Sequence, residues 1–145
     1  MAKSLSQVCA AFVAAIEAIS TDERAGSSDK FHGRVGYPDT TGGDRAFGVT
    51  ATFGGVRALA APGGTVVCPD VHEVELFITV NYTWTSEVMA RILDDGEALT
   101  EAIEDLRASD ADLLEVLLDV PDLVLEGENG SVVVTRSCVV QYQRA

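Results

Sequence analysis

Residues 73–84 have the sequence EVELFITVNYTW, and this stretch predicts the central strand of the fold. Large apolar side chains alternate with mostly polar ones, which is the period of a strand with one buried face. The apolar set is Val74, Leu76, Ile78, Val80, Tyr82 and Trp84. The opposite set is Glu73, Glu75, Phe77, Thr79, Asn81 and Thr83. We therefore expect a sheet with one face covered by helices and the other face mostly exposed to water.

A helix is predicted before this strand and another after it. Ser4 and Gln7 match a capping box ahead of an apolar stripe with helical spacing, so the first helix is expected over residues 5–19. The second helix is expected over residues 87–107, with Thr85 or Ser86 as its cap. Its apolar stripe is formed by Val88, Ile92, Leu99, Ile103 and Leu106.

Two further features of the helical region are predicted. Asp94-Asp95-Gly96 is a point at which the second helix could bend or split. A third, short helix is expected to start at Ser109 or Asp110 and to end at Pro121. Its apolar residues are Leu113, Leu114, Val116, Leu117 and Leu118.

Shorter strands complete the predicted sheet. They are expected over residues 31–37 and 47–53, and residues 123–126 and 131–142 are expected to pair as a hairpin around Asn129-Gly130. Residues 54–69 form either an extension of a hairpin or a loop that stands away from the body. The predicted fold is one α+β domain over residues 1–145. It has a mostly antiparallel sheet of about five or six strands, an N-terminal helix and a central acidic helix packed on one face, and a C-terminal β-hairpin.

The composition is strongly acidic. Lys plus Arg is 10 and Asp plus Glu is 23, which gives a net charge of −13. Because DNA binding depends on Lys and Arg neutralising phosphates, we expect poor affinity for DNA. An acidic wall past which DNA slides would have this charge, and so would a protein that is acidic for solubility alone. No apolar run approaches the ~20 residues of a membrane helix, so no membrane association is expected.

The sequence offers few residues for catalysis or metal binding. Cys68-Pro69-Asp70-Val71-His72 holds two metal ligands, whereas a zinc site needs three or four. Cys68 with His32 or His72 is the only nucleophile–base pair that can be named, and no neighbour of Cys68 predicts an activated thiol. Cys9 and Cys138 lie in apolar patterns and are expected to be buried, reduced thiols. We therefore expect no enzyme activity, no cofactor and no metal.

The order of elements resembles the tail terminator proteins of long-tailed bacteriophages of the lambda type. The resemblance covers nearly the whole chain, from the opening helix to the hairpin around Asn129-Gly130 and the ending Val139-Val140-Gln141-Tyr142-Gln143-Arg144. It implies a homohexameric ring that ends the tail tube and joins it to the head. It also implies contacts with a tail tube protein and a head-neck connector protein, and a lumen that DNA crosses without specific binding. The implied location is the virion, after synthesis in the host cytoplasm.

In such a ring, the exposed side of the second helix is predicted to face the lumen or its rim. The candidate lumen-facing residues are Asp94, Asp95, Glu97, Glu101, Glu104 and Asp105. Other functions stay open. The chain could be a head-completion or neck connector protein, or a cellular ligand-binding or regulatory domain with an apolar pocket near Phe77, Tyr82 and Trp84. A small enzyme would depend on Cys68 and His72.

Overall fold

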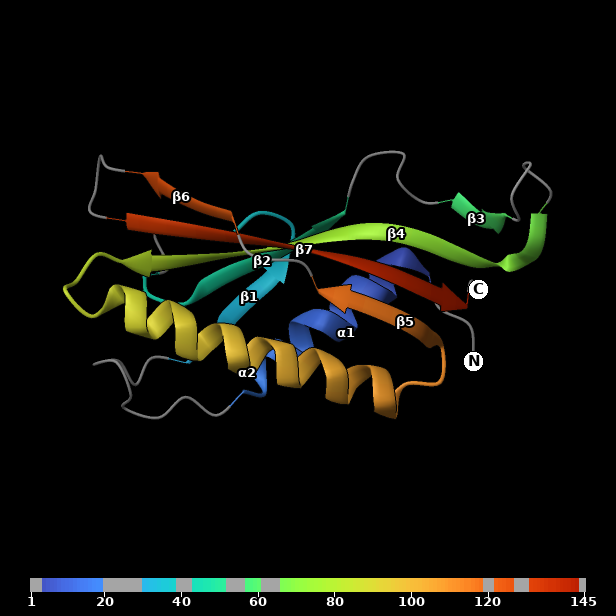
Figure 1. Cartoon of the computed structure of the whole chain (residues 1–145), viewed down its shortest axis with the longest axis horizontal. Helices are drawn as coiled ribbons and strands as arrows, with labels where there is room; N and C mark the ends of the chain where they lie inside the picture. Colours follow the sequence, from blue (N-terminus) through green and yellow to red (C-terminus); the bar gives the residue numbers. More distant parts are fainter. Residues whose placement is uncertain are drawn as a thin grey trace.

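In the computed structural model, two helices cover one face of a single sheet (Figure 1). The structure describes residues 4–19, 30–38, 43–51, 57–60, 66–118, 122–126 and 131–143. The helices are α1 (Leu5–Glu17) and α2 (Val88–Ser109). The strands are β1 (His32–Val35), β2 (Ala46–Ala51), β3 (Arg57–Ala60), β4 (Val66–Thr83), β5 (Leu113–Leu118), β6 (Asp122–Glu126) and β7 (Ser131–Gln143). The predicted α+β class is confirmed.

The predicted sheet is wrong in its details, because the described residues form seven strands in a mixed sheet. Its order is β1-β2-β4-β7-β5, with β3 paired to β4 and β6 paired to β7. β1 runs parallel to β2, and the other pairings are antiparallel. A parallel pair joined by residues 36–45 is not a hairpin, so turn signals along the sequence did not predict it.

Two long strands, β4 and β7, form the centre of the sheet. They pair continuously from Val71 opposite Gln143 to Thr83 opposite Ser131. Each has two partners on its outer side, one after the other. β2 pairs with residues 76–81 of β4, and β3 pairs with residues 66–73. In β7, β6 pairs with residues 131–135 and β5 pairs with residues 138–142. The β3 pairing shows that residues 57–60 extend a hairpin, which was one of the two predicted alternatives.

The predicted third helix is wrong, because residues 113–118 form β5. A run of six apolar-rich residues suits a buried strand as well as a short helix, and periodicity does not separate the two. Here the backbone of β7 decides the outcome, since Leu113 to Leu118 pair with Tyr142 to Cys138. The side chain of Asp110, a proposed cap of that helix, instead accepts a hydrogen bond from the backbone N–H of Asp112 at 3.0 Å. The closing hairpin is confirmed as β6 with β7, and Asn129-Gly130 lies outside the described residues.

Both predicted long helices are present, with small differences at their ends. The Ser4–Gln7 capping box is confirmed, and α1 ends at Glu17 rather than Ile19. α2 runs without a break through Gly96. Its N-cap is Glu87, which makes no capping hydrogen bond, so neither Thr85 nor Ser86 is the cap.

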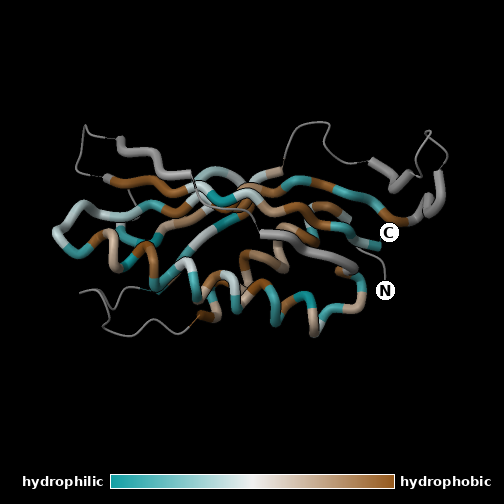
Figure 2. The backbone as a smooth tube through the Cα atoms, viewed as in Figure 1, coloured by the Kyte–Doolittle hydropathy of each residue, from teal (hydrophilic) through white to brown (hydrophobic). Residues whose placement is uncertain are grey.

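The core lies between the two helices and the inner face of β4 and β7. The alternation predicted for β4 is confirmed from Val74 to Tyr82, whose inward side chains are buried. Trp84 does not belong to this face, because it follows the strand and is 58% exposed. Along these strands and α2, Figure 2 shows hydrophobic residues alternating with hydrophilic ones. Such patterning leaves the outward faces of α2 and of the sheet available for contacts with partners.

Candidate functional site

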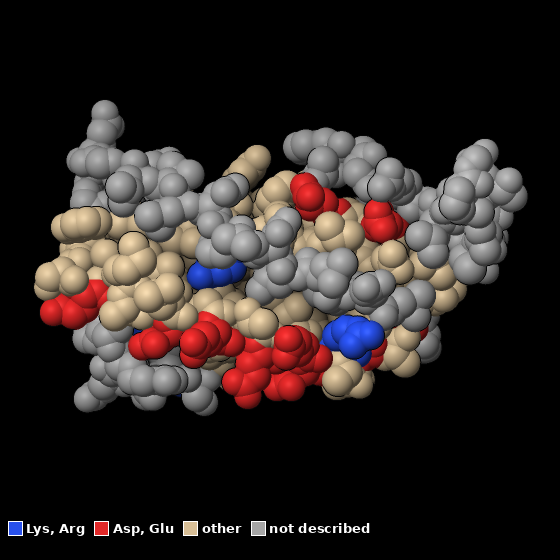
Figure 3. Space-filling view, viewed as in Figure 1, with Lys and Arg blue, Asp and Glu red and all other residues tan. Residues whose placement is uncertain are grey.

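Most of the acidic residues predicted for α2 form a continuous exposed face. Glu97, Glu101, Glu104 and Asp105 are exposed and Asp94 is half-buried. Figure 3 shows this band of carboxylates along the helix. We call these five residues the acidic face. It is an extended surface, since the side chains point outward from one helix and do not converge on a point.

Asp95 is an exception, and its assignment to the acidic face is wrong. It is 4% exposed and points into the core, where it accepts hydrogen bonds from Arg45 Nε and Nη2, both at 2.9 Å. The Tyr82 hydroxyl donates to the same carboxylate at 2.9 Å. Burial and the Asp95 carboxylate raise the pKa of Tyr82 well above its ordinary value, so this hydroxyl remains a donor. Asp95 points inward because it lies four positions before Leu99, and residues four apart share one side of a helix.

A second buried ion pair lies close to the first. Arg91 Nη1 donates to Asp44 Oδ2 at 2.8 Å, and the other oxygen of Asp44 accepts from the Thr83 backbone N–H at 3.0 Å. Asp44 and Arg45 belong to the turn before β2, in which Arg45 has a φ of 61°. The Arg45 guanidinium also lies 5.6 Å from the centre of the Phe31 ring.

Arg136 completes this group of buried charges, which we call the buried charge cluster. It lies on the inward face of β7 and is 3% exposed. Its Nη2 donates to the Ile92 carbonyl at 3.4 Å. A Cβ on Gly96 would lie 2.9 Å from that same nitrogen, so the glycine leaves room for the guanidinium against α2. Gly96 therefore does not bend α2 as predicted. Its lack of a side chain makes space for the Arg136 guanidinium.

The cluster changes the charge that the protein presents to partners. Its three arginines and two aspartates carry a net charge of +1. Because the whole chain carries −13, the residues outside the cluster carry −14. Sequence analysis missed the cluster. Arg136 was the available signal, because it occupies an inward position between Val134 and Cys138 in an alternating strand. A charge at such a position is almost always paired in the core or functional.

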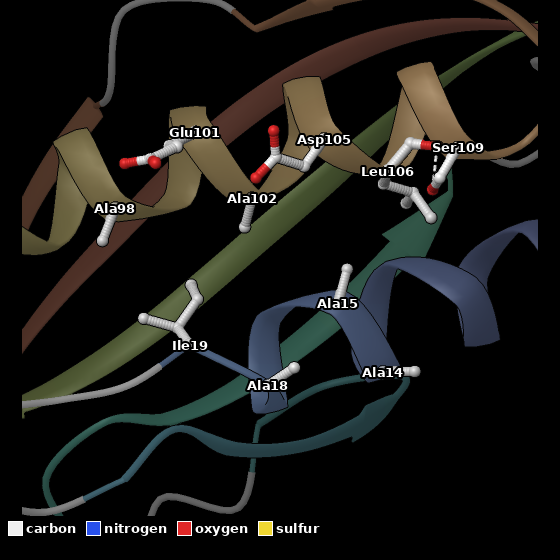
Figure 4. A pocket seen from close by; sticks show the side chains of 10 residues that line it. All are labelled: Ala14, Ala15, Ala18, Ile19, Ala98, Glu101, Ala102, Asp105, Leu106 and Ser109. Atoms are coloured by element: carbon white, nitrogen blue, oxygen red, sulfur yellow. Dashed lines mark hydrogen bonds between the residues drawn. The ribbon is translucent and has the colours of Figure 1, made fainter.

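A groove of about 760 Å³ runs between α1 and α2. We call it the interhelix groove, and Figure 4 shows its side chains. Its walls are largely small and apolar, with Glu101, Asp105 and Ser109 as the polar members. The Ser109 hydroxyl already donates to the Leu106 carbonyl at 3.1 Å. The lining residues are Ala14, Ala15, Ala18, Ile19, Ala98, Glu101, Ala102, Asp105, Leu106 and Ser109.

A second groove, of about 600 Å³, lies where α1 meets the β1 edge of the sheet. We call it the edge groove. Val35 and Tyr37 at this edge are 50% and 75% exposed, which is high for large apolar side chains. The lining residues are Leu5, Ser6, Cys9, Val35, Gly36, Tyr37, Val49, Thr50, Ala51 and Phe77.

The residues considered for catalysis or a ligand pocket do not come together around one site. His32 is exposed, and the His72 ring packs against Tyr142 with 6.1 Å between ring centres. The side chain of Cys68 lies outside the described residues. Of the three residues proposed for an apolar pocket, Phe77 lines the edge groove, Tyr82 is in the core and Trp84 is exposed. In the part of the chain that the structure describes, no three His, Cys, Asp or Glu side chains are grouped as metal ligands.

The predicted burial of Cys9 and Cys138 is confirmed, and both are free thiols. Burial raises the pKa of both, that of Cys138 to about 12. A thiol with a raised pKa holds its proton at neutral pH and is a weak nucleophile. Cys9 therefore contributes apolar surface to the edge groove rather than reactivity.

Comparison with known proteins adds no relative: no family model matches the sequence, and no curated protein matches it. Neither described helix combines the length and the hydropathy of a membrane-spanning segment. The features of the molecule that bear on its function are the two grooves, the acidic face and the buried charge cluster.

Proposed function

We propose that this protein is a structural subunit that assembles with copies of itself into a ring of the phage tail terminator type. Such a ring ends the tail tube and joins it to the head, and DNA crosses its lumen. The proposal includes a tail tube protein and a head-neck connector as neighbours, and the virion as the location. A head-completion or neck connector protein is the related alternative, because it would assemble through the same kinds of surface.

The observation that carries the proposal is the apolar surface at the β1 edge of the sheet. β1 is the outermost strand on its side, and among the described residues it pairs only with β2. Natural proteins cover or blunt such edges, because an exposed strand recruits another chain. Here the edge lies beside the edge groove and the exposed side chains of Val35 and Tyr37. A neighbouring copy that covered this region would supply a strand to pair with β1 and would bury the apolar surface at the same time.

The acidic face supports the part of the proposal that concerns DNA. Its five carboxylates lie on one helix, and of the two arginines in α2, Arg91 is buried and Arg107 is exposed in the last turn. A phosphate backbone near such a surface meets repulsion rather than the Lys and Arg that DNA-binding proteins present. If α2 faces the lumen, DNA passes without being retained.

A ligand-binding domain is a second candidate, and the edge groove is the observation that favours it. A volume of about 600 Å³ with mostly apolar walls suits a small apolar molecule. Its uncharged polar members are Ser6, Tyr37 and Thr50. A monomer that binds an apolar dye, in competition with a metabolite, would favour this candidate.

Light scattering after size-exclusion chromatography tests the ring. A hexamer has six times the chain mass of 15.3 kDa, or about 92 kDa. Val35→Asp would place a charge in the apolar edge and is expected to reduce the oligomer to smaller species. The matched control is Leu93→Asp, because Leu93 is 63% exposed on α2 and lines neither groove. A monomeric wild type at about 100 μM, or equal behaviour of the two variants, would contradict the proposal.

A further inference from the structure

We infer that the interhelix groove is a docking site for an amphipathic α-helix of a different protein, one with Lys or Arg beside its apolar face. This inference goes beyond the ring, because it concerns a surface away from the β1 edge and holds whether or not copies of the chain assemble.

The shape of the groove suits large apolar side chains. Five of its ten lining residues are alanines, contributed by α1, its C-cap and α2, and they leave space because their side chains end at Cβ (Figure 4). Ile19 and Leu106 add larger apolar surface. A groove between two helices, open along its length, is the shape that receives the i, i+3, i+4 and i+7 side chains of a third helix. Its volume of about 760 Å³ leaves room for several such side chains.

The charge of the groove selects a basic partner. Its charged lining residues are Glu101 and Asp105, both exposed, and both come from α2. Among the described residues that line the groove, none is Lys or Arg. The field of these two carboxylates is reinforced by the rest of the acidic face and by the charge of −14 outside the buried cluster. Charge complementarity at a rim of this kind steers association and determines which partner is accepted.

The described helices of a second copy do not meet this requirement. α1 contains no Lys or Arg. α2 has two arginines, of which Arg91 is buried and Arg107 is exposed in the last turn, and its other charges on the exposed side are the carboxylates of the acidic face. Placing α1 in the groove would bring no basic side chain to Glu101 and Asp105, and α2 would bring one exposed arginine together with five carboxylates of like charge. The partner is therefore another protein.

The test is a binding titration with a designed peptide. The probe is a fluorescently labelled 18-residue helix of Leu and Lys with one apolar face, and its counterpart has Glu in place of Lys. Fluorescence anisotropy in 0.15 M salt should show binding of the Leu/Lys peptide and none of the Leu/Glu peptide. Equal binding of both peptides, or no binding of the Leu/Lys peptide at 100 μM protein, would overturn the inference.

Variants of the protein separate docking in the groove from general attraction to an acidic protein. Glu101→Lys with Asp105→Lys should weaken binding at least tenfold. The matched control, Glu75→Lys with Glu97→Lys, changes the net charge equally at exposed positions outside the lining, and should weaken binding less than threefold. Ala102→Phe fills the groove without changing charge and should also weaken binding about tenfold. Equal losses in the two charge variants, or unchanged binding by a folded Ala102→Phe protein, would contradict docking in the groove.

Discussion

Asp95 shows how the position of one side chain can be predicted wrongly from its neighbours in the sequence. It lies between Asp94 and Gly96 in a helix with many carboxylates, yet it accepts three hydrogen bonds inside the core. A buried ion pair contributes little net stability compared with an apolar pair of the same volume. Its loss is costly, because the remaining charge stays buried without a partner.

Asp95→Asn should lower the free energy of unfolding by about 3–5 kcal/mol, because it removes the charge that compensates Arg45. Tyr82→Phe removes one hydrogen bond to the same carboxylate and should cost about 1.5–3 kcal/mol. Urea unfolding followed by circular dichroism measures both. Glu97→Gln is the control on the exposed side of the helix and should change stability by less than about 0.5 kcal/mol. A loss below 1 kcal/mol for Asp95→Asn would show that Asp95 is not buried against Arg45.

Among the helices and strands, α1 begins where hydrogen bonds between neighbouring residues cap it. The Ser4 hydroxyl accepts from the Gln7 backbone N–H at 3.3 Å, and the Gln7 side chain accepts from the Ser4 backbone N–H at 2.9 Å. The helix then buries Val8, Cys9, Phe12 and Ile16 in the core, while Ala14 and Ala15 line the interhelix groove. α1 therefore supplies core residues on one side, and its other sides line the interhelix groove and the edge groove.

Ser4→Ala should destabilise the protein by about 1 kcal/mol, because a backbone N–H at the helix start loses its acceptor. Ser4→Asp keeps an acceptor at this position and should remain within about 0.5 kcal/mol of wild type. Thermal unfolding monitored at 222 nm compares the two. If Ser4→Asp were as unstable as Ser4→Ala, the capping box would not be the cause of the loss.

For the molecule as a whole, charge opposes the association that the β1 edge favours. Copies that each carry −13 repel one another, while the edge groove and its exposed apolar residues attract. Repulsion between exposed charges is screened by salt, and the Debye length falls from about 30 Å at 0.01 M to about 3 Å at 1 M. Burial of apolar surface is not weakened in this way.

Higher ionic strength should therefore shift the protein toward its oligomer. Sedimentation velocity at 0.02 M and 0.5 M NaCl, at one protein concentration, would measure the shift. Binding of the basic peptide to the interhelix groove should change in the opposite direction, because that attraction is between unlike charges. Dissociation of the oligomer at high salt would show that copies are held by ion pairs, and would contradict an apolar interface at the β1 edge.

Local sequence determined the parts of the protein in which neighbours along the chain set the outcome. The alternation from Val74 to Tyr82 predicted the buried face of β4, and the Ser4–Gln7 spacing predicted the start of α1. The length and stripe of α2 were predicted as well, since helical hydrogen bonds join residues four apart. Much of the acidic face followed from the same period.

Only the tertiary structure decided the features that depend on groups far apart in the sequence. Residues 113–118 became β5 because β7 offered backbone partners, and the inward position of Asp95 is compensated by Arg45, which lies 50 positions away in the sequence. Both grooves exist only where α1 has packed beside α2 and the β1 edge. Hydrogen bonds and ion pairs between distant residues depend on which surfaces meet, and no local period carries that information.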